Sequence, residues 1–188
     1  MSVAGPSRRR VLSLATGCAL WASLETRAGQ SEQGAGNEAG LGGARWLPLP
    51  EDLPTPALRL PDLQGHVWEL AQEQGVPVLV NFWATWCEPC RAEMKSFEVL
   101  QSHFAARRLK VVAVNYKEAR DVVLRFRNAN AVSLALVRDS YGDATRAWGV
   151  TIFPTTFVIN SSGRAIVRIE GEVDWGQAAN QKRLHTFL

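Results

Sequence analysis

The sequence has few cysteines, no long hydrophobic run and little excess charge outside its first residues. Three cysteines among 188 residues exclude a small domain that is scaffolded by disulfides. The longest weakly polar stretch, Val11–Leu24, has 14 residues, and a membrane-spanning helix needs about 20. This excludes an ordinary membrane span. Hydrophobic residues make up 46% of the chain, so we expect one globular domain with a core.

The charge of the chain is concentrated near its start. The formal net charge is +3, but residues 1–28 hold four basic residues and one acidic residue. The remainder has 17 basic and 17 acidic residues. Because this balance gives no basic surface, we expect no nucleic-acid partner.

Residues 1–28 have the pattern of an export signal. A basic segment at Ser7–Arg10 precedes an apolar run at Val11–Ala22, and cleavage is expected after Ala28. The paired arginines resemble a twin-arginine signal, although the general secretory route stays open. A lipoprotein signal with acylated Cys18 also stays open, and either that lipid or an uncleaved signal would anchor the protein to a membrane. All three interpretations place the rest of the chain in the periplasm or another extracytoplasmic space.

The segment after the signal is rich in glycine and proline. Residues 29–45 contain six glycines and few apolar residues, and five prolines follow between residues 48 and 61. Such a composition buries too little surface to offset the entropy of ordering it. We therefore predict a flexible linker over residues 29–57 and a folded domain over residues 58–188.

From residue 58 onward, short apolar segments alternate with amphipathic ones. This order predicts an α/β fold with a mixed central sheet flanked by helices. The predicted strands are 58–60 and 66–70, which form a hairpin, then 76–83, 110–116, 134–137, 155–159 and 164–170. The predicted helices follow the second cysteine, span 119–128 and 141–148, and begin near a capping Asp174 at the C-terminal end.

The chemistry is expected where the strand at 76–83 leads into a helix, at Trp86-Cys87-Glu88-Pro89-Cys90. Residues i and i+3 share one face of a helix, so the two sulfurs can close a disulfide. Cys87 at the helix N-terminus has unpaired N–H groups nearby that stabilise a thiolate, whereas Cys90 is shielded inside the helix. We predict that Cys87 exchanges with a substrate disulfide and that Cys90 resolves the mixed disulfide.

The cysteine pair has two alternative interpretations without redox chemistry, a zinc site and a purely structural disulfide. A zinc site needs about four ligands, and only the scattered His66, His103 and His185 remain, so no metal is expected. A structural disulfide of this spacing would remove little chain entropy. No flavin or nicotinamide motif is present, so we expect no cofactor. Electrons must then come from a separate membrane or exported protein.

The stretch Val78-Leu-Val-Asn-Phe-Trp-Ala-Thr-Trp-Cys-Glu-Pro-Cys90 resembles the thioredoxin superfamily. Within it, the chain is most similar to the exported TlpA-like thiol–disulfide reductases, which include the ResA-like and CcmG-like proteins of cytochrome c maturation. The similarity continues through residues 91–94, 112–115 and 149–159. It implies the thioredoxin fold with an extra N-terminal β-hairpin. It also implies a cis peptide bond at Phe153–Pro154, with both residues facing the substrate.

The resemblance also directs attention to residues around the cysteines. Asn81 stands where classical thioredoxins carry a buried Asp. Glu93 stands where TlpA-like proteins carry an acid near the cysteines, and it continues the three-residue spacing of the pair along one helix face. We expect Glu93 to modulate the reaction as a base, the alternative being an ordinary solvated helix residue.

Neighbouring motif residues complete the predicted site. Glu88 is expected to oppose a negative charge on Cys87 and thereby favour a reducing function, and Pro89 and Trp86 are expected to modulate the same pair.

The leading hypothesis is a thiol–disulfide oxidoreductase that reduces protein disulfides, with oxidised apocytochrome c as one candidate substrate. A disulfide oxidase or isomerase is the alternative. A copper-handling or binding module is a third, but the motif has no nearby histidine.

Overall fold

The computed structural model describes residues 43–188. The predicted signal at 1–28, with Cys18, lies outside this range, as do residues 29–42 of the predicted linker. Within residues 43–188, no helix has the length and hydrophobicity that crossing a bilayer requires.

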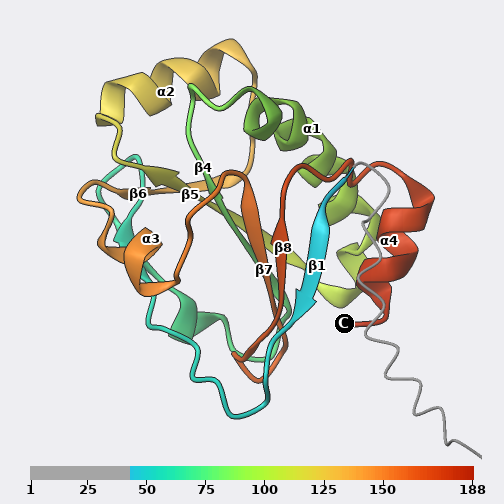
Figure 1. Ribbon diagram of the computed structural model, residues 1–188. Coiled ribbons are helices and arrows are strands. Elements are labelled where there is room, and N and C mark those ends of the chain that lie inside the picture. The colour runs from blue at the N-terminus through green and yellow to red at the C-terminus, as the bar shows by residue number, and fades with distance from the viewer. Residues whose placement is uncertain (1–42) are drawn as a thin grey trace, which may run out of the picture. The chain divides into compact units, whose positions relative to one another are not determined.

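Six strands form a central mixed sheet in the order β1-β8-β7-β4-β5-β6 (Figure 1). The β4–β5 and β5–β6 pairs are parallel, and the other three pairs are antiparallel. The fold class predicted from the sequence is thereby confirmed. The strands are β1 (Arg45–Pro48), β4 (Val78–Trp83), β5 (Lys110–Tyr116), β6 (Ala135–Asp139), β7 (Thr155–Ile159) and β8 (Ala165–Glu170).

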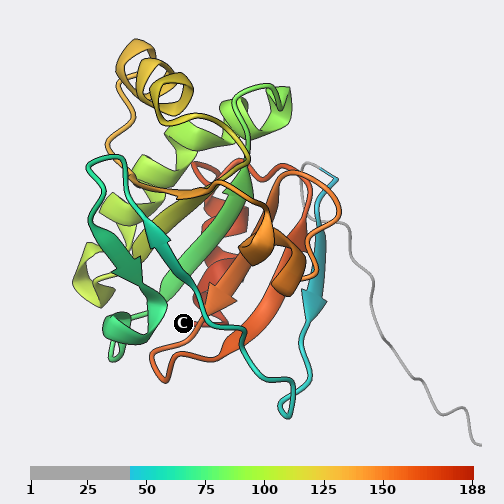
Figure 2. The ribbon, with the colours of Figure 1, turned by 90° about the vertical axis from the view of Figure 1, so that its left-hand side faces the viewer.

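Helices cover the sheet on both faces (Figures 1 and 2). The side chains of α1, α2 and α4 pack into one core cluster, whereas Trp148, directly after α3, packs into the other. The helices are α1 (Glu88–His103), α2 (Arg120–Ala129), α3 (Asp143–Ala147) and α4 (Ala178–His185), with short 3-10 helices η1 (Leu70–Glu73) and η2 (Ala105–Arg107).

Strand β4 lies at the centre and leads directly to the cysteines. All six of its residues are buried, because both faces of the sheet are covered. Val78, Val80 and Phe82 belong to the core beneath α3. Leu79 and Trp83 belong to the core beneath α1. Asn81 therefore projects toward α1, since side chains alternate along a strand.

The predicted N-terminal hairpin forms a separate small sheet. Strands β2 (Arg59–Pro61) and β3 (Val67–Glu69) pair antiparallel, with Leu60 opposite Trp68. Leu58 and Leu70 flank the hairpin and are buried in the core cluster that contains Trp148.

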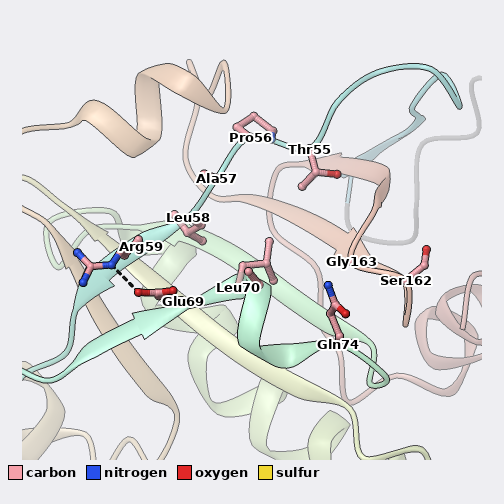
Figure 3. A pocket seen from close by; sticks show the side chains of 11 residues that line it. Thr55, Pro56, Ala57, Leu58, Arg59, Glu69, Leu70, Gln74, Ser162 and Gly163 are labelled. Atoms are coloured by element: carbon pink, nitrogen blue, oxygen red, sulfur yellow. Dashed lines mark hydrogen bonds and ion pairs between the residues drawn. The ribbon is translucent and has the colours of Figure 1, made fainter.

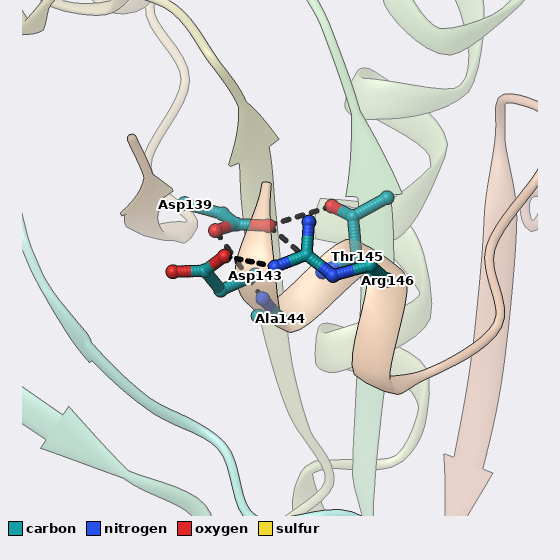
Figure 4. A network of polar contacts seen from close by, with 5 residues as sticks. All are labelled: Asp139, Asp143, Ala144, Thr145 and Arg146. Carbon is teal, nitrogen blue, oxygen red and sulfur yellow. Dashed lines mark hydrogen bonds and ion pairs between the residues drawn. The ribbon is translucent and has the colours of Figure 1, made fainter. Parts of the chain in front are cut away.

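A buried aspartate at the end of β6 holds the start of α3 (Figure 4). The carboxylate of Asp139 accepts hydrogen bonds from the backbone of Ala144 at 3.3 Å and of Thr145 at 2.8 Å. The Thr145 hydroxyl donates to the same carboxylate at 2.7 Å. These contacts satisfy N–H groups that a helix start leaves without partners. The helix is shorter than the predicted 141–148.

Two boundaries predicted from the sequence are wrong. Arg45–Pro48, assigned to the linker 29–57, forms edge strand β1, because Trp46 buries its ring and pairs opposite Ile169 of β8. The folded domain therefore begins before residue 58. Asp174 does not cap α4: Gln177 is the N-cap, and Asp174 instead accepts from the Gly176 backbone at 2.9 Å.

Candidate active site

The cysteine pair lies at the N-terminus of α1, and a short loop, residues 84–86, separates it from strand β4. Cys87 is the N-cap residue, and its Sγ accepts a hydrogen bond from the Cys90 backbone N–H at 3.3 Å. The two residues form a disulfide with a Cα–Cα separation of 5.3 Å. Cys87 is 6% exposed and Cys90 is 1% exposed. Cys87 is thus the more accessible of the two cysteines, and it lies at the helix end whose N–H groups have no partner inside the helix.

The first turn of α1 contains Glu88 and Pro89, both exposed. Proline fits there because the first N–H groups of a helix have no partner inside it. The acidic side chain of Glu88 is favourable at the positive end of the helix dipole. It also places a carboxylate next in sequence to Cys87.

Aromatic side chains from three segments form a series of ring contacts that begins at Trp86, the residue before Cys87. The Phe153–Pro154 peptide bond is cis, as the resemblance implies. The Phe153 ring contacts Trp86 edge-on, with centroids 5.8 Å apart, and lies 5.1 Å from the Tyr116 ring. Trp86 is 63% exposed and Ile152 is 45% exposed. The exposed Trp86 ring, next in sequence to Cys87, can contact a protein substrate.

Glu93 lies one turn further along α1 than Cys90 and is 1% exposed. Its Oε1 accepts a hydrogen bond from Trp175 Nε1 at 2.6 Å, and its Oε2 accepts from Asn81 Nδ2 at 3.4 Å. The same Asn81 amide donates to Thr156 Oγ1 at 3.0 Å. Asn81 and Thr156 are register partners on β4 and β7. Glu93 is therefore not a solvated helix residue.

Burial has a large effect on the Glu93 carboxyl. Desolvation raises its pKa from the usual 4.5 to about 8. Hydrogen bonds from Trp175, the Val173 backbone and Asn81 act in the opposite direction, and the nearby Glu172 carboxylate adds to the rise. A carboxyl with a pKa in this range can take up or release a proton near neutral pH.

Two residues near the site were missed in the sequence. Trp175 is 82 residues from Glu93 and lies in the loop before α4, so local spacing could not connect them. Glu118 follows β5, and its carboxylate accepts from the Thr85 backbone at 2.8 Å and from Asn115 Nδ2 at 2.7 Å. It thereby fixes the loop that precedes Cys87. The only available signal was an acid two residues after a predicted strand.

Other features of the described residues do not join this site. A cavity of about 290 Å³ lies between the chain around Pro56, the start of η1 and the turn at Ser162–Gly163 (Figure 3). Its lining includes the Arg59–Glu69 ion pair and neither cysteine. Across residues 43–188, no group of three or more His, Cys, Asp or Glu side chains is arranged to hold a metal ion.

Comparison with known proteins gives consistent similarities. Residues 52–168 match the model of the AhpC/TSA family. The chain is 33% identical over 123 residues to the thiol-disulfide oxidoreductase ResA of Bacillus subtilis, covering 65% of this chain and 69% of that one. It is 35% identical over 107 residues to the ResA protein of Halalkalibacterium halodurans, covering 57% and 61%. The matches thus span about two thirds of the length of these relatives.

A solved structure shows the same fold. The thiol:disulfide interchange protein of the thioredoxin family from Chlorobium tepidum superposes with a TM-score of 0.61 and 25% identity, covering 70% of this chain and 94% of that one.

Proposed function

The chain belongs to the AhpC/TSA family, with a match that includes both cysteines, and we propose that it reduces protein disulfides outside the cytoplasm. The observation that carries this proposal is the order of three groups along α1: Cys87 at the N-cap, buried Cys90, and buried Glu93. The similarity to thiol–disulfide oxidoreductases supports the same chemistry.

In the first step, the reduced protein attacks a substrate disulfide through the Cys87 thiolate. The helix N-terminus stabilises this thiolate. A bond forms between Cys87 Sγ and one substrate sulfur, and the substrate S–S bond breaks. The other substrate sulfur leaves as a thiolate and takes a proton from solvent. Trp86 and Phe153 provide apolar contacts for the chain around the substrate cysteine.

In the second step, Cys90 releases the substrate. Its S–H bond breaks, the proton goes to Glu93, and the electron pair on sulfur attacks Cys87. The Cys87–Cys90 disulfide forms as the bond between Cys87 and the substrate breaks, and the second substrate sulfur leaves reduced. Glu93 is needed because a buried thiol loses its proton with difficulty.

Export and electron supply complete the proposal. Residues 1–28 direct the chain out of the cytoplasm, and a separate membrane or exported protein returns two electrons to the disulfide. Oxidised haem-binding cysteine pairs of apocytochromes c are the substrate class that we propose to test first.

A trapping experiment tests the function. Cys90→Ala prevents resolution, so full-length protein expressed in its native host should accumulate as mixed disulfides on Cys87. Mass spectrometry identifies the trapped proteins. The matched control is Cys87→Ala, which should trap nothing. Equal recovery from both variants would contradict the assigned roles.

The base role of Glu93 has a kinetic test. Glu93→Gln keeps the shape and removes the base, so the rate of reduction of a model disulfide should fall and its pH profile should lose one ionisation. General-base contributions are typically about 10²–10⁴-fold, and we expect the low end or less because thiols also ionise through water. Glu98→Gln, on the same helix, is the control and should match the parent. Identical pH profiles for Glu93→Gln and parent would contradict the proposal that Glu93 acts as a base.

A further inference from the structure

The loop between β8 and α4 places one buried indole against the Glu93 carboxylate. Trp175 is 0% exposed, and its Nε1 donates to Glu93 Oε1 at 2.6 Å. An indole N–H is a donor only, so this oxygen cannot donate a proton back to it. The other oxygen, Oε2, has a longer 3.4 Å contact with Asn81. The two oxygens of one carboxylate therefore have different environments.

The position of the indole is fixed from several sides. Its ring stacks on Phe97 of α1, with centroids 5.5 Å apart, and meets the Trp46 ring edge-on at 5.8 Å. Gln181 of α4 donates to the Trp175 backbone carbonyl at 2.9 Å. Elements α1, β1 and α4 thus hold one side chain in place, and such packing allows a donor to orient its acceptor.

We infer that Trp175 is a positioning residue for thiol–disulfide exchange: it occupies Oε1 of Glu93, so that the proton from Cys90 is received at Oε2. The inference rests on the proposed function. The S–H bond of Cys90 breaks, an O–H bond forms at Oε2, and the electron pair stays on sulfur for the attack on Cys87. Edge strand β1 contributes through Trp46, which packs against the indole.

The charged groups around Glu93 determine what removing the donor does. On its own helix the neighbour is the Cys90 thiol of the reduced protein. The loop before α4 contributes the Glu172 carboxylate, which opposes ionisation, and the Val173 backbone N–H, which favours it. Strand β4 contributes the neutral amide of Asn81. Trp175→Phe keeps an aromatic ring and removes the N–H that favours the ionised carboxylate. Glu93 should then stay protonated to higher pH.

The central experiment measures the exchange rate of full-length Trp175→Phe against pH. A hydrogen bond to a charged group favours the ionised form, so without the Trp175 N–H the Glu93 ionisation in the profile should move up by about one pH unit. The rate at pH 7 should then fall up to about tenfold. Trp148→Phe is the matched control: Trp148 is also buried, at 4% exposed, and its Nε1 has no hydrogen-bond partner among the described residues. Its profile should match the parent.

A double-variant cycle separates positioning from a merely structural role. In a Glu93→Gln background, Trp175→Phe should leave the exchange rate unchanged, because the base that it positions is gone. A further loss in that background, or equal profiles for Trp175→Phe and Trp148→Phe, would overturn the inference. A parent protein no more active than Cys87→Ala would instead refute the proposed function.

The pH dependence of the Trp175 indole N–H resonance can be measured on the parent protein, so this test does not require Trp175→Phe to fold. With ¹⁵N-labelled tryptophan, the indole N–H resonance of Trp175 should shift with pH through the ionisation of Glu93. The shift should be absent in Glu93→Gln. An indole resonance that is insensitive to pH in the parent would show that the 2.6 Å contact has no role in the ionisation.

Discussion

Replacement of Glu93 by glutamine should change how the stability of the protein depends on pH. The native carboxyl has a pKa of about 8, raised mainly by burial, against 4.5 in the unfolded chain. Below about pH 4.5 the Glu93 carboxyl is protonated in both the native protein and the unfolded chain. Between the two values the unfolded chain ionises while the native protein keeps its proton, so the free energy of unfolding falls as pH rises.

The magnitude follows from the two pKa values. They differ by about 3.5, and each pKa unit corresponds to about 1.36 kcal/mol, which gives about 5 kcal/mol as an upper limit. Glutamine does not titrate, and its amide oxygen can still accept from Trp175. The stability advantage of Glu93→Gln over the parent should therefore grow by up to about 5 kcal/mol between pH 4.5 and 8.

Urea unfolding of the oxidised proteins at several pH values measures this difference. Glu98→Gln provides the control, since Glu98 lies on the same helix and bonds the exposed Ser133. The free energy of unfolding of Glu98→Gln should change with pH in the same way as that of the parent. A difference between Glu93→Gln and parent that stays constant with pH would refute the burial of an ionisable Glu93.

Three further variants or treatments have defined outcomes. Limited alkylation of the reduced protein should label Cys87 before Cys90, as peptide mass spectrometry would show, and the reverse order would exchange their roles. Glu88→Gln should make the reduction potential less negative by no more than about 30 mV, because the exposed carboxylate opposes a thiolate beside it, and a more negative potential would contradict this. Trp46→Ala should lower the free energy of unfolding by about 3–5 kcal/mol, because β1 is part of the folded domain. A change below about 1 kcal/mol would indicate that β1 belongs to the linker instead.

The elements next to the cysteines were predictable because their signals are local. Strand β4 is a continuous apolar run, and the motif that follows it places a helix start at Cys87. Strand β1 was missed for the opposite reason. It has four residues between a glycine-rich segment and several prolines, and it becomes a strand only by pairing with β8, more than a hundred residues away.

The site shows the same division between local and distant signals. The three-residue spacing placed Cys87, Cys90 and Glu93 on one helix face. The partners of Glu93 come from other elements: Asn81 from β4, and Trp175 from a loop near the C-terminus. Only the folded chain brings them together, so the sequence indicated the acid but not what holds it.

The reduction potential of the Cys87–Cys90 pair tests the reducing function most directly. The purified protein would be equilibrated with defined dithiol–disulfide buffers, and its oxidised fraction would be determined by mass spectrometry after thiol alkylation. Thioredoxin lies at about −270 mV, and the strong oxidant DsbA at about −120 mV. We expect a potential near that of thioredoxin. A value near −120 mV would contradict the reducing function and identify the protein as an oxidant.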